Sequence, residues 1–317
     1  MGEPRRRAHS WCMALPDTRD DLDALRRSID DRSLHLLYQP EVDLATGTIV
    51  AMEALLRWQH PERGLLCPGQ FLELAASGGE LSRIGDWVLR EGLAEAARWG
   101  RLPGPTRRLW LNVTAREFAA PSFVERLEGL LRDSGLPSGA IGLEFAESCA
   151  ADLGPAAGPV LAGLRQAGVA LAVDNFSNWY VTLGVIEALP VDVVKLCQRY
   201  VRGMGTLEGE RIVATVVTQA HANGLTVVAE GVETLAEAER LTALGCDRAH
   251  GWLYGSAQRA DKARWLLERG TGWQSAGIPV PAAVVPSDAL GGASSARLDL
   301  TGRLPGPRAT SDRLVDR

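Results

Sequence analysis

Residues 34–58 read LHLLYQPEVDLATGTIVAMEALLRW, and this stretch decides the first part of the predicted fold. Leu34–Tyr38 has the apolar character of a strand, which Val42–Leu44 continues, and Ile49–Trp58 is a second strand of the same kind. Only the turn Ala45-Thr46-Gly47-Thr48 separates them. Because so short a connection joins antiparallel neighbours, we expect the two strands to pair as a hairpin.

Six short apolar runs along the chain each lead to a residue that can bind a metal or move a proton. Runs this short and this rich in Val, Ile and Leu are typical of buried parallel strands. The residues that follow the runs are Glu53, Asn112, Glu144, Asp174, Lys195 and Glu230. Polar residues at successive strand ends indicate the rim of an α/β barrel, where active sites lie.

Helical patterns lie between these runs, as alternating strands and helices around a mostly parallel sheet require. One helix is expected over Thr114–Ser134 and another across Trp179–Ala188, and a last strand around Ala249–Tyr254. The chain has 317 residues, of which 46% are hydrophobic. One barrel of about 250 residues plus tails therefore fits better than two domains.

The predicted barrel domain spans residues 18–270. Residues 1–17 are basic and contain proline, and residues 271–317 are rich in Pro, Gly, Ser, Ala and Arg. Both tails have the composition of disordered segments. We expect no membrane span, because no stretch approaches 18 uninterrupted apolar residues.

The charge balance argues against a protein that binds a nucleic acid polymer. The net charge is -5, with 34 basic and 39 acidic residues, whereas such proteins are usually basic. A small phosphate ligand held by a few arginines stays compatible with this balance. The five cysteines are odd in number and form no Cys-x-x-Cys pair, which favours a reducing compartment such as the cytoplasm and argues against zinc.

Lysine is rare in this chain, with only Lys195 and Lys262 against 32 arginines. Positive charge without a specific role is therefore supplied by arginine. Chance alone could put a lysine at a strand end, but the rim position of Lys195 favours a functional role. An ammonium group differs from a guanidinium group in size, hydration and the mobility of its pKa.

Four of the strand-end residues offer oxygen atoms to a cation. Glu53, Glu144 and Asp174 bring carboxylates and Asn112 brings an amide oxygen, which suits Mg²⁺ or Mn²⁺ and not zinc. Any one of them alone would more often cap a helix or form a surface salt bridge. Four together indicate a shared cation, because clustered carboxylates repel one another without one.

A cation beside Lys195, Glu230 and Glu233 suits the hydrolysis of a phosphate ester. The cation would activate a water molecule and neutralise charge on the phosphoryl oxygens. Arg57 lies four residues after Glu53 and either holds a phosphate oxygen or is an ordinary surface arginine.

Several ordered motifs resemble those of the EAL-domain family, whose members hydrolyse or merely bind the bacterial second messenger cyclic di-GMP. The resemblance covers residues 18–268. The motifs are Tyr38-Gln39-Pro40, Glu53-Ala54-Leu55-Leu56-Arg57-Trp58, Leu111-Asn112-Val113, Glu144-Phe145-Ala146-Glu147-Ser148, Leu189-Pro190-Val191-Asp192 with Lys195, Ala229-Glu230-Gly231-Val232-Glu233-Thr234 and Leu244-Gly245-Cys246-Asp247. It implies a modified (β/α)8 TIM-like barrel with an antiparallel first strand.

The resemblance also assigns roles to single residues. The expected metal ligands are Glu53, Asn112, Glu144 and Asp174. Lys195 matches the lysine that contacts the attacking water, and Glu230 matches the glutamate proposed as base or water-orienting group. The positions that contact the dinucleotide are Gln39, Leu55 and Arg57. The glutamates that support adjacent loops are Glu147 and Glu233.

The implied reaction is Mg²⁺- or Mn²⁺-dependent cleavage of one phosphodiester bond in cyclic di-GMP, which gives linear pGpG. Besides the ligand, the expected partner is a second copy of the chain or another signalling protein.

This chain departs from the family pattern on the expected catalytic rim. Asn175 follows Asp174 where the family has a second aspartate, so a second cation should bind more weakly. The loop over residues 176–182 is rewritten. Cys197 stands where the family has aspartate, and His250 where it has glutamine.

Two of these departures have alternative interpretations. His250 either ligates a metal or replaces glutamine as a neutral hydrogen-bonding group, and we favour the second because the other ligands are hard oxygen groups. Cys197 is either a small buried residue or a nucleophile, and we favour the first because no activating base is evident beside it.

The expected function is cyclic di-GMP binding with attenuated or absent hydrolysis. A fully working phosphodiesterase is the first alternative, since the expected metal ligands, Lys195 and Glu230 are present. A protein-interaction scaffold that has lost the nucleotide is the second.

Overall fold

The computed structural model describes the barrel part of the chain. The described residues are 19–102, 107–118, 120, 122–147, 157–176 and 190–268. All of them lie within one of two compact units of the chain, Met1–Ala283. The expected tails, 1–17 and 271–317, lie outside the described residues, so the domain boundaries stay a prediction.

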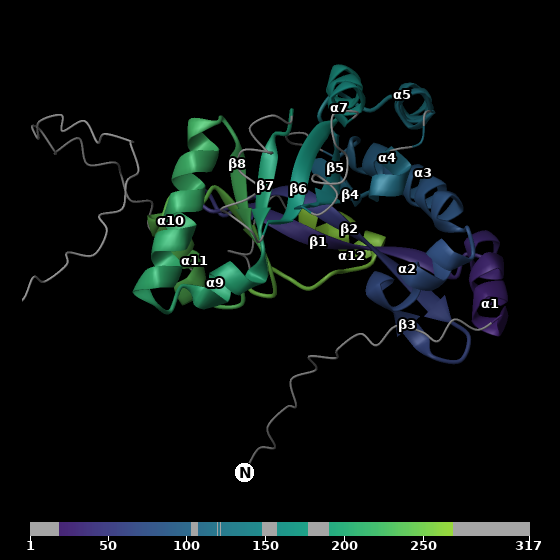
Figure 1. Ribbon diagram of the computed structural model, residues 1–317, viewed down its shortest axis with the longest axis horizontal. Helices are drawn as coiled ribbons and strands as arrows, with labels where there is room; N and C mark the ends of the chain where they lie inside the picture. The colour runs from purple at the N-terminus through teal and green to yellow at the C-terminus, as the bar shows by residue number, and fades with distance from the viewer. Residues whose placement is uncertain are drawn as a thin grey trace, which may run out of the picture. The chain divides into compact units, whose positions relative to one another are not determined.

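Strands and helices alternate along most of the described chain (Figure 1). The strands are β1 (Leu34–Asp43), β2 (Ile49–His60), β3 (Gly64–Leu66), β4 (Arg108–Asn112), β5 (Ile141–Ala146), β6 (Ala170–Phe176), β7 (Val193–Leu196), β8 (Thr226–Ala229) and β9 (Arg248–His250). The helices are α1 (Arg19–Asp30), α2 (Pro68–Ser77), α3 (Leu81–Trp99), α4 (Ala115–Phe118), α5 (Phe123–Ser134), α7 (Ala157–Gln166), α9 (Gln198–Gly203), α10 (Leu207–Ala222), α11 (Leu235–Ala243) and α12 (Ala260–Glu268).

The sheet closes into a ring because β1 pairs with both β2 and β9. Both of these pairings are antiparallel, whereas the pairings from β2 through β4 to β9 are parallel. The short β3 pairs with β2 outside the ring, which leaves eight strands in the barrel. This arrangement confirms the predicted modified (β/α)8 barrel with an antiparallel first strand, including the β1–β2 hairpin.

The strand β9 is held by few backbone pairs. It pairs with β1 over Glu41–Asp43 and with β8 at Val228 and Ala229. A last strand running to Tyr254 was expected, but it ends at His250. The next residue, Gly251, packs so closely against the backbone of Val232 that an added Cβ would lie 2.2 Å from the Val232 oxygen.

Small residues and one tryptophan fill the barrel interior beneath the strand ends. Side chains two apart on a strand share a face, so Trp110 points inward like Asn112, and Ala172 like Asp174. Trp110 is fully buried, and a Cβ on Gly142 would come within 2.1 Å of its ring. The buried residues of this interior layer are Ala51, Trp110, Ala170, Ala172, Val193 and Val228. These residues form the layer of the barrel interior directly beneath the polar residues on the same face of the strands.

Helices cover the outside of the ring, with α10 against β8 and α3 against β4 (Figure 1). None of the helices in the described part of the chain is long and apolar enough to cross a membrane. Two helices, α4 and α5, replace the single helix expected over Thr114–Ser134. Pro121 lies between them in the sequence, and a proline cannot continue a helix from the preceding turn. The helix expected across Trp179–Ala188 lies outside the described residues.

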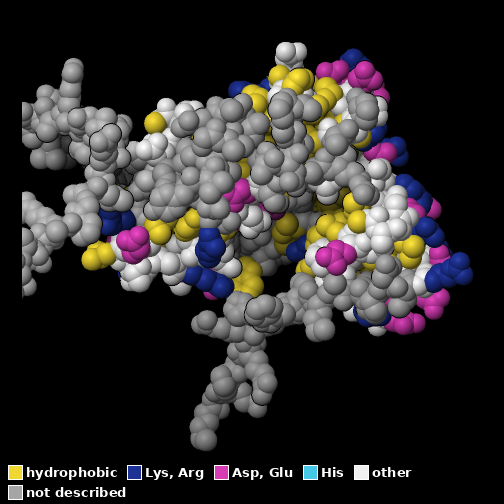
Figure 2. Space-filling model, in the orientation of Figure 1, with side chains coloured by type: hydrophobic (Ala, Val, Ile, Leu, Met, Phe, Trp, Pro, Cys, Tyr) yellow, Lys and Arg dark blue, Asp and Glu magenta, His cyan; other side chains and the backbone are white. Residues whose placement is uncertain are grey.

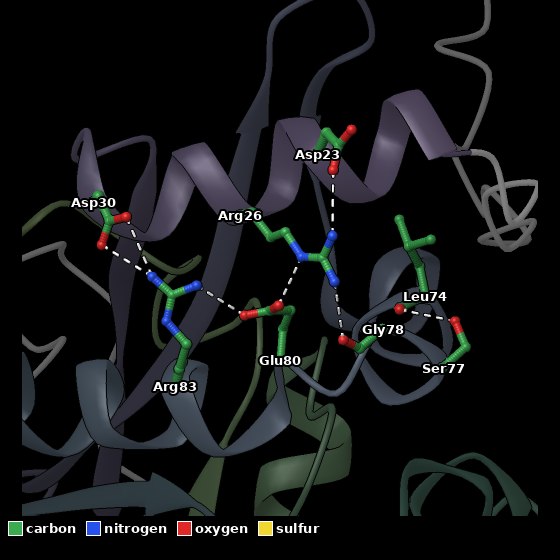
Figure 3. Close-up of polar contacts among 8 residues, drawn as sticks. All are labelled: Asp23, Arg26, Asp30, Leu74, Ser77, Gly78, Glu80 and Arg83. Atoms are coloured by element: carbon green, nitrogen blue, oxygen red, sulfur yellow. Dashed lines mark hydrogen bonds and ion pairs between the residues drawn. The ribbon is translucent and has the colours of Figure 1, made fainter.

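Ion pairs connect α1 with the start of α3 (Figure 3). The buried carboxylate of Glu80 accepts hydrogen bonds from Arg26 Nε at 2.8 Å and from Arg83 Nη1 at 2.9 Å. Arg83 also donates to Asp30, and Arg26 to the carbonyl oxygen of Gly78. The hydrogen bond from Arg26 is the main reason that the pKa of Glu80 lies below its ordinary value.

Candidate functional site

The polar strand-end residues come together at one end of the barrel. They lie on or directly after consecutive strands of the ring. The set is Glu53 on β2, Asn112 on β4, Glu144 on β5, Asp174 on β6, Lys195 on β7, Glu230 after β8 and His250 on β9. In a parallel sheet these ends share an edge, which is why residues so far apart in sequence converge.

Lys195 lies at the centre of this cluster and is only 1% exposed. Its Nζ is 3.0 Å from Glu53 Oε2, 2.8 Å from Glu144 Oε1 and 3.7 Å from Glu230 Oε1. One ammonium group therefore contacts two carboxylates that lie on β2 and β5 and a third directly after β8. The other lysine, Lys262, lies on α12 with its Nζ over the ring of Trp265.

Asn112, His250 and Asp174 complete the cluster around this centre. Asn112 Nδ2 donates a hydrogen bond to Glu53 Oε1 at 3.2 Å. The Nε2 atom of His250 lies 3.3 Å from Glu230 Oε1 and 3.7 Å from Glu53 Oε2. Asp174 and Glu230 interact closely enough for each to shift the pKa of the other.

Asn175 follows directly after Asp174 and has an uncommon backbone conformation. Its φ is 54°, a value that asparagine tolerates better than most residues. Its Nδ2 donates to Asp174 Oδ2 at 3.0 Å, which an aspartate at this position could not do. Cys197 is buried at the start of α9, and its N–H donates to the carbonyl oxygen of Phe176.

Burial and neighbouring charges decide the protonation of the central residues. Burial disfavours the ammonium of Lys195, but the charges of Glu144 and Glu53 outweigh it and raise its pKa well above the ordinary value. Burial alone would raise the pKa of Glu53, but the charges of Lys195 and His250 lower it below the ordinary value. These groups are therefore held in their charged forms.

The remaining carboxyl groups divide into two kinds. Burial raises the pKa of Glu144 well above the ordinary value despite the charge of Lys195. Burial and the charge of Glu230 raise the pKa of Asp174 to about 7. Burial would also raise the pKa of Glu230, but the hydrogen bond with His250 and the charge of Lys195 lower it to about 2. Glu144 and Asp174 are therefore the carboxyl groups of the cluster that hold a proton most readily.

The donor set fits a divalent cation such as Mg²⁺ or Mn²⁺, because it consists of carboxylate and amide oxygens. The buried Glu144 Oε2 and Asp174 Oδ1 have no hydrogen-bond partner within the described chain. As these side chains stand, no three His, Cys, Asp or Glu groups in the described ranges are placed to hold one ion. Lys195 Nζ contacts both Glu53 Oε2 and Glu144 Oε1 at hydrogen-bond distance.

A cavity of about 690 Å³ opens above the cluster. The predicted site residues that line it are Gln39, Glu53, Leu55, Arg57, Asn112, Asp174, Asn175, Glu230, Glu233 and His250. Glu144, Lys195, Glu147 and Cys197 are not among its lining residues. Acidic and basic side chains both occur among the coloured residues on the face that Figure 2 shows.

Two predicted ligand-contacting residues are held by hydrogen bonds at the wall of the cavity. Gln39 Nε2 donates to the carbonyl oxygen of Gly255 at 3.0 Å, and Arg57 Nη1 donates to its own neighbour, Leu56, at 2.8 Å. The remaining donors of Arg57 can still reach a ligand, since a guanidinium group has five N–H bonds.

Among the cavity-lining residues that sequence reasoning missed are Gln198, Arg202 and Trp252. Gln198 Nε2 and Arg202 Nη2 both donate to Glu233 Oε1 at 3.1 Å. Their spacing of four residues puts them on one face of α9, and α9 itself was not predicted. The available signal was the position of Lys195, because residues that follow soon after a site residue such as Lys195 can line the same cavity.

Comparison with known proteins places the chain in a family. The family model described as the EAL domain matches residues 22–257. An uncharacterized Mycobacterium tuberculosis protein, Rv1354c, is 37% identical over 257 residues, which are 79% of this chain and 41% of that protein. A Pseudomonas aeruginosa protein named cyclic di-GMP phosphodiesterase PA2567 is 36% identical over 240 residues, covering 75% of this chain and 41% of that protein.

A solved structure extends this likeness to the fold. The PaMucR phosphodiesterase in complex with c-di-GMP is 34% identical and has a TM-score of 0.72, covering 76% of this chain and 98% of that one. The chain spans about two fifths of the length of the two curated relatives described above. On the extent of these matches, the chain belongs to the EAL-domain family.

Proposed function

We propose that this chain binds cyclic di-GMP in the cavity above the Lys195 cluster, and that its hydrolysis of this ligand is attenuated or absent. The observation that carries the proposal is the convergence of seven polar strand-end residues beneath a cavity of about 690 Å³. Relatives whose names contain cyclic di-GMP support the choice of ligand.

Binding would rest on the predicted contact residues Gln39, Leu55 and Arg57, all of which line the cavity. A cavity of this volume lies in the range of small-molecule sites. The guanidinium group of Arg57 matches the geometry of a phosphate, and the apolar side chain of Leu55 can pack against the ligand.

Catalysis would use the residues beneath the ligand. We propose Glu53, Asn112, Glu144 and Asp174 as the groups that would hold Mg²⁺ or Mn²⁺. When bound, such a cation neutralises charge on the phosphoryl oxygens and lowers the pKa of a water molecule. The ammonium of Lys195 would hold the attacking water by a hydrogen bond.

Two features of the site support slow turnover. Glu230, with a pKa of about 2, would orient a water by accepting its hydrogen bond but is a weak base at neutral pH. Asn175 offers an amide where the family has a second carboxylate, and its Nδ2 already binds an oxygen of Asp174. A second cation would therefore find less negative charge here.

A working phosphodiesterase is the second candidate, and the retention of Glu53, Asn112, Glu144, Asp174, Lys195 and Glu230 in one cluster favours it. A scaffold that ignores the nucleotide is the least favoured, because the cavity keeps its predicted contact residues. In the first proposal, a second copy of the chain or a partner signalling protein would recognise the chain with cyclic di-GMP bound.

The test combines a binding isotherm with a product assay. The purified chain is titrated with cyclic di-GMP by calorimetry in Mg²⁺ or Mn²⁺, and pGpG is measured by chromatography. Loss of a charge-assisted phosphate contact in Arg57→Ala should weaken binding by about 10- to 150-fold. Arg211→Ala, on the exposed surface of α10, is the control and should bind normally.

The outcomes separate the three candidates. Tight binding with little pGpG supports the first proposal, whereas rapid pGpG formation makes the chain a working enzyme. Absence of binding up to high micromolar ligand rejects both and leaves the scaffold. The double variant Asn175→Asp with Cys197→Asp should raise turnover if these replacements limit it.

A further inference from the structure

The strand β1 has an outer edge that is only partly paired. Along Glu41–Asp43 this edge pairs with β9, and Tyr38 exchanges two backbone hydrogen bonds with Gln258, at 2.7 and 2.8 Å. Continued in the same register, Ala260 would pair with Leu36, but α12 begins at Ala260 and turns the chain away. In the described part of the chain, the start of β1 is therefore left without a strand on this side.

The open edge presents the backbone of Leu34 and Leu36. Alternate residues of an antiparallel strand direct their N–H and C=O groups to the same side, so these two face the same way as Tyr38. Ser33 lies at the opposite phase, and its carbonyl oxygen accepts a hydrogen bond from Gln59 N–H toward β2. Within the described residues, the N–H and C=O groups of Leu34 and Leu36 have no hydrogen-bond partner. These groups are available to a further strand.

A second cavity, of about 670 Å³, lies along this edge and shares no lining residue with the cavity above the Lys195 cluster. Leu65 from β3 and Trp87 from α3 bring apolar side chains to its lining. Leu65 is 50% exposed, whereas Leu34 and Leu36 are 2% and 7% exposed. The open edge therefore lies at the bottom of a groove with an apolar wall. We call it the β1 groove.

The depth of the β1 groove limits what can pair with its edge. A second folded copy would carry the same edge at the bottom of the same groove, so the two edges could not meet. A single extended peptide can enter, because a strand needs only about 4.8 Å of width in the hydrogen-bonding direction.

The charges of the β1 groove favour a basic partner. Glu91 and Asp261 are exposed in its lining and form no ion pair within the described residues. Arg259 is the only arginine or lysine among the described lining residues. A positive side chain on the peptide would therefore be attracted to the rim.

We propose that the β1 groove binds an extended segment of a partner protein as an additional β-strand. The segment pairs its backbone with Leu34 and Leu36, packs apolar side chains against Leu65 and Trp87, and places a basic side chain beside Glu91. In this mode of recognition, main-chain hydrogen bonds supply affinity and alternate side chains supply specificity. The proposal concerns a surface outside the nucleotide cavity and does not depend on the proposed function.

The test measures fluorescence polarisation of a labelled synthetic peptide with the purified full chain, without nucleotide. The probe has about six residues, alternates valine with threonine and carries lysines at one end. It should bind saturably, because main-chain pairing tolerates many sequences. A matched peptide with N-methyl groups on alternate amides cannot donate these hydrogen bonds and should bind about 5- to 100-fold more weakly.

Variants of exposed residues locate the binding on the chain. Leu65→Asp should weaken binding of the probe by about 5- to 30-fold, because it removes apolar contact area. Leu207→Asp changes an 84% exposed leucine on α10 and should match the parent chain. Glu91→Lys should weaken binding by about 3- to 10-fold, and less at high salt. Thermal melting checks that each variant is folded.

The outcomes decide the proposal. Absence of saturable binding up to high micromolar probe would overturn it, and so would equal affinity for the N-methylated peptide or equal losses in Leu65→Asp and Leu207→Asp. Binding that appears only after residues 1–17 or 271–317 are deleted would assign the groove to the chain itself and overturn the partner strand. A dimer that the probe dissociates in sedimentation experiments would assign the groove to a second copy instead.

Discussion

Replacing Lys195 with methionine removes the single ammonium group on which the buried carboxylates depend. Methionine has a similar length and no charge, so the change isolates the electrostatic contribution. Breaking a buried ion pair by removing one partner destabilises a protein by about 3–5 kcal/mol. Since Lys195 is 1% exposed and contacts Glu53 and Glu144 within 3.0 Å, its replacement should fall in this range.

Urea denaturation at pH 7 measures the loss in the free energy of unfolding of Lys195→Met, and a thermal melt gives an independent check. For a domain of roughly 250 residues, a loss of about 3–5 kcal/mol lowers the melting temperature by about 6–20 °C. Lys262→Met is the matched control, because it removes the only other lysine from the surface of α12. The control should change the free energy of unfolding by no more than about 1 kcal/mol, the size of one exposed cation–π contact.

The pH dependence of this loss follows from the lowered pKa values of Glu53 and Glu230. A carboxyl group with a depressed folded pKa contributes stability above its unfolded pKa and loses it as the pH falls through the folded value. Without Lys195 these pKa values rise, so the carboxylates of the variant take up protons at a higher pH. The deficit of Lys195→Met should therefore shrink between pH 7 and pH 5. A deficit below about 1 kcal/mol at pH 7, or one that grows toward pH 5, would refute this reasoning.

Three further predictions concern other parts of the structure. The pKa of Asp174 is raised from 3.8 to about 7 on folding, so the folded state binds more protons in this window and stability falls as pH rises through it. Asp174→Asn should gain stability relative to the parent as pH rises from 4 to 7, and parallel urea midpoints across this range would contradict the shift. Glu80→Gln should lower the free energy of unfolding by no more than about 1 kcal/mol, because Arg26 stays half exposed and regains water. Asp23→Asn is its exposed control, and a larger change for the control would contradict the role of Glu80. Gly251→Ala should lower the melting temperature by several degrees, since its Cβ collides with backbone atoms, and an unchanged melting temperature would show that the turn relaxes freely.

The barrel was predictable from sequence because its strands are short apolar runs with polar ends. The pattern at Glu53, Asn112 and Glu144 indicated both the strands and their common edge. The short turn at residues 45–48 was enough to predict the antiparallel hairpin, since four residues cannot cross over to a parallel neighbour. A local sequence pattern predicts strand pairing where the length of the connection allows only one arrangement of the two strands.

Other features depended on contacts between distant residues and could not be read from sequence. The last strand ends at His250, and the next residue, Gly251, packs against Val232, which is 19 positions earlier in the chain. The position of Lys195 Nζ between Glu53 and Glu144 likewise depends on three separate strands. The helix α9 is only six residues long and has no long hydrophobic period.

The narrowest part of the barrel wall is β9, a three-residue strand with two backbone pairs on one side and three on the other. A thermal fluctuation that detaches this strand would break fewer hydrogen bonds than one that opens the hairpin β1–β2. Such a breathing motion would withdraw His250 from Glu230 while leaving Lys195 among its carboxylates. The strand held by the fewest backbone pairs thus carries His250, the imidazole that contacts the acidic centre within the described residues.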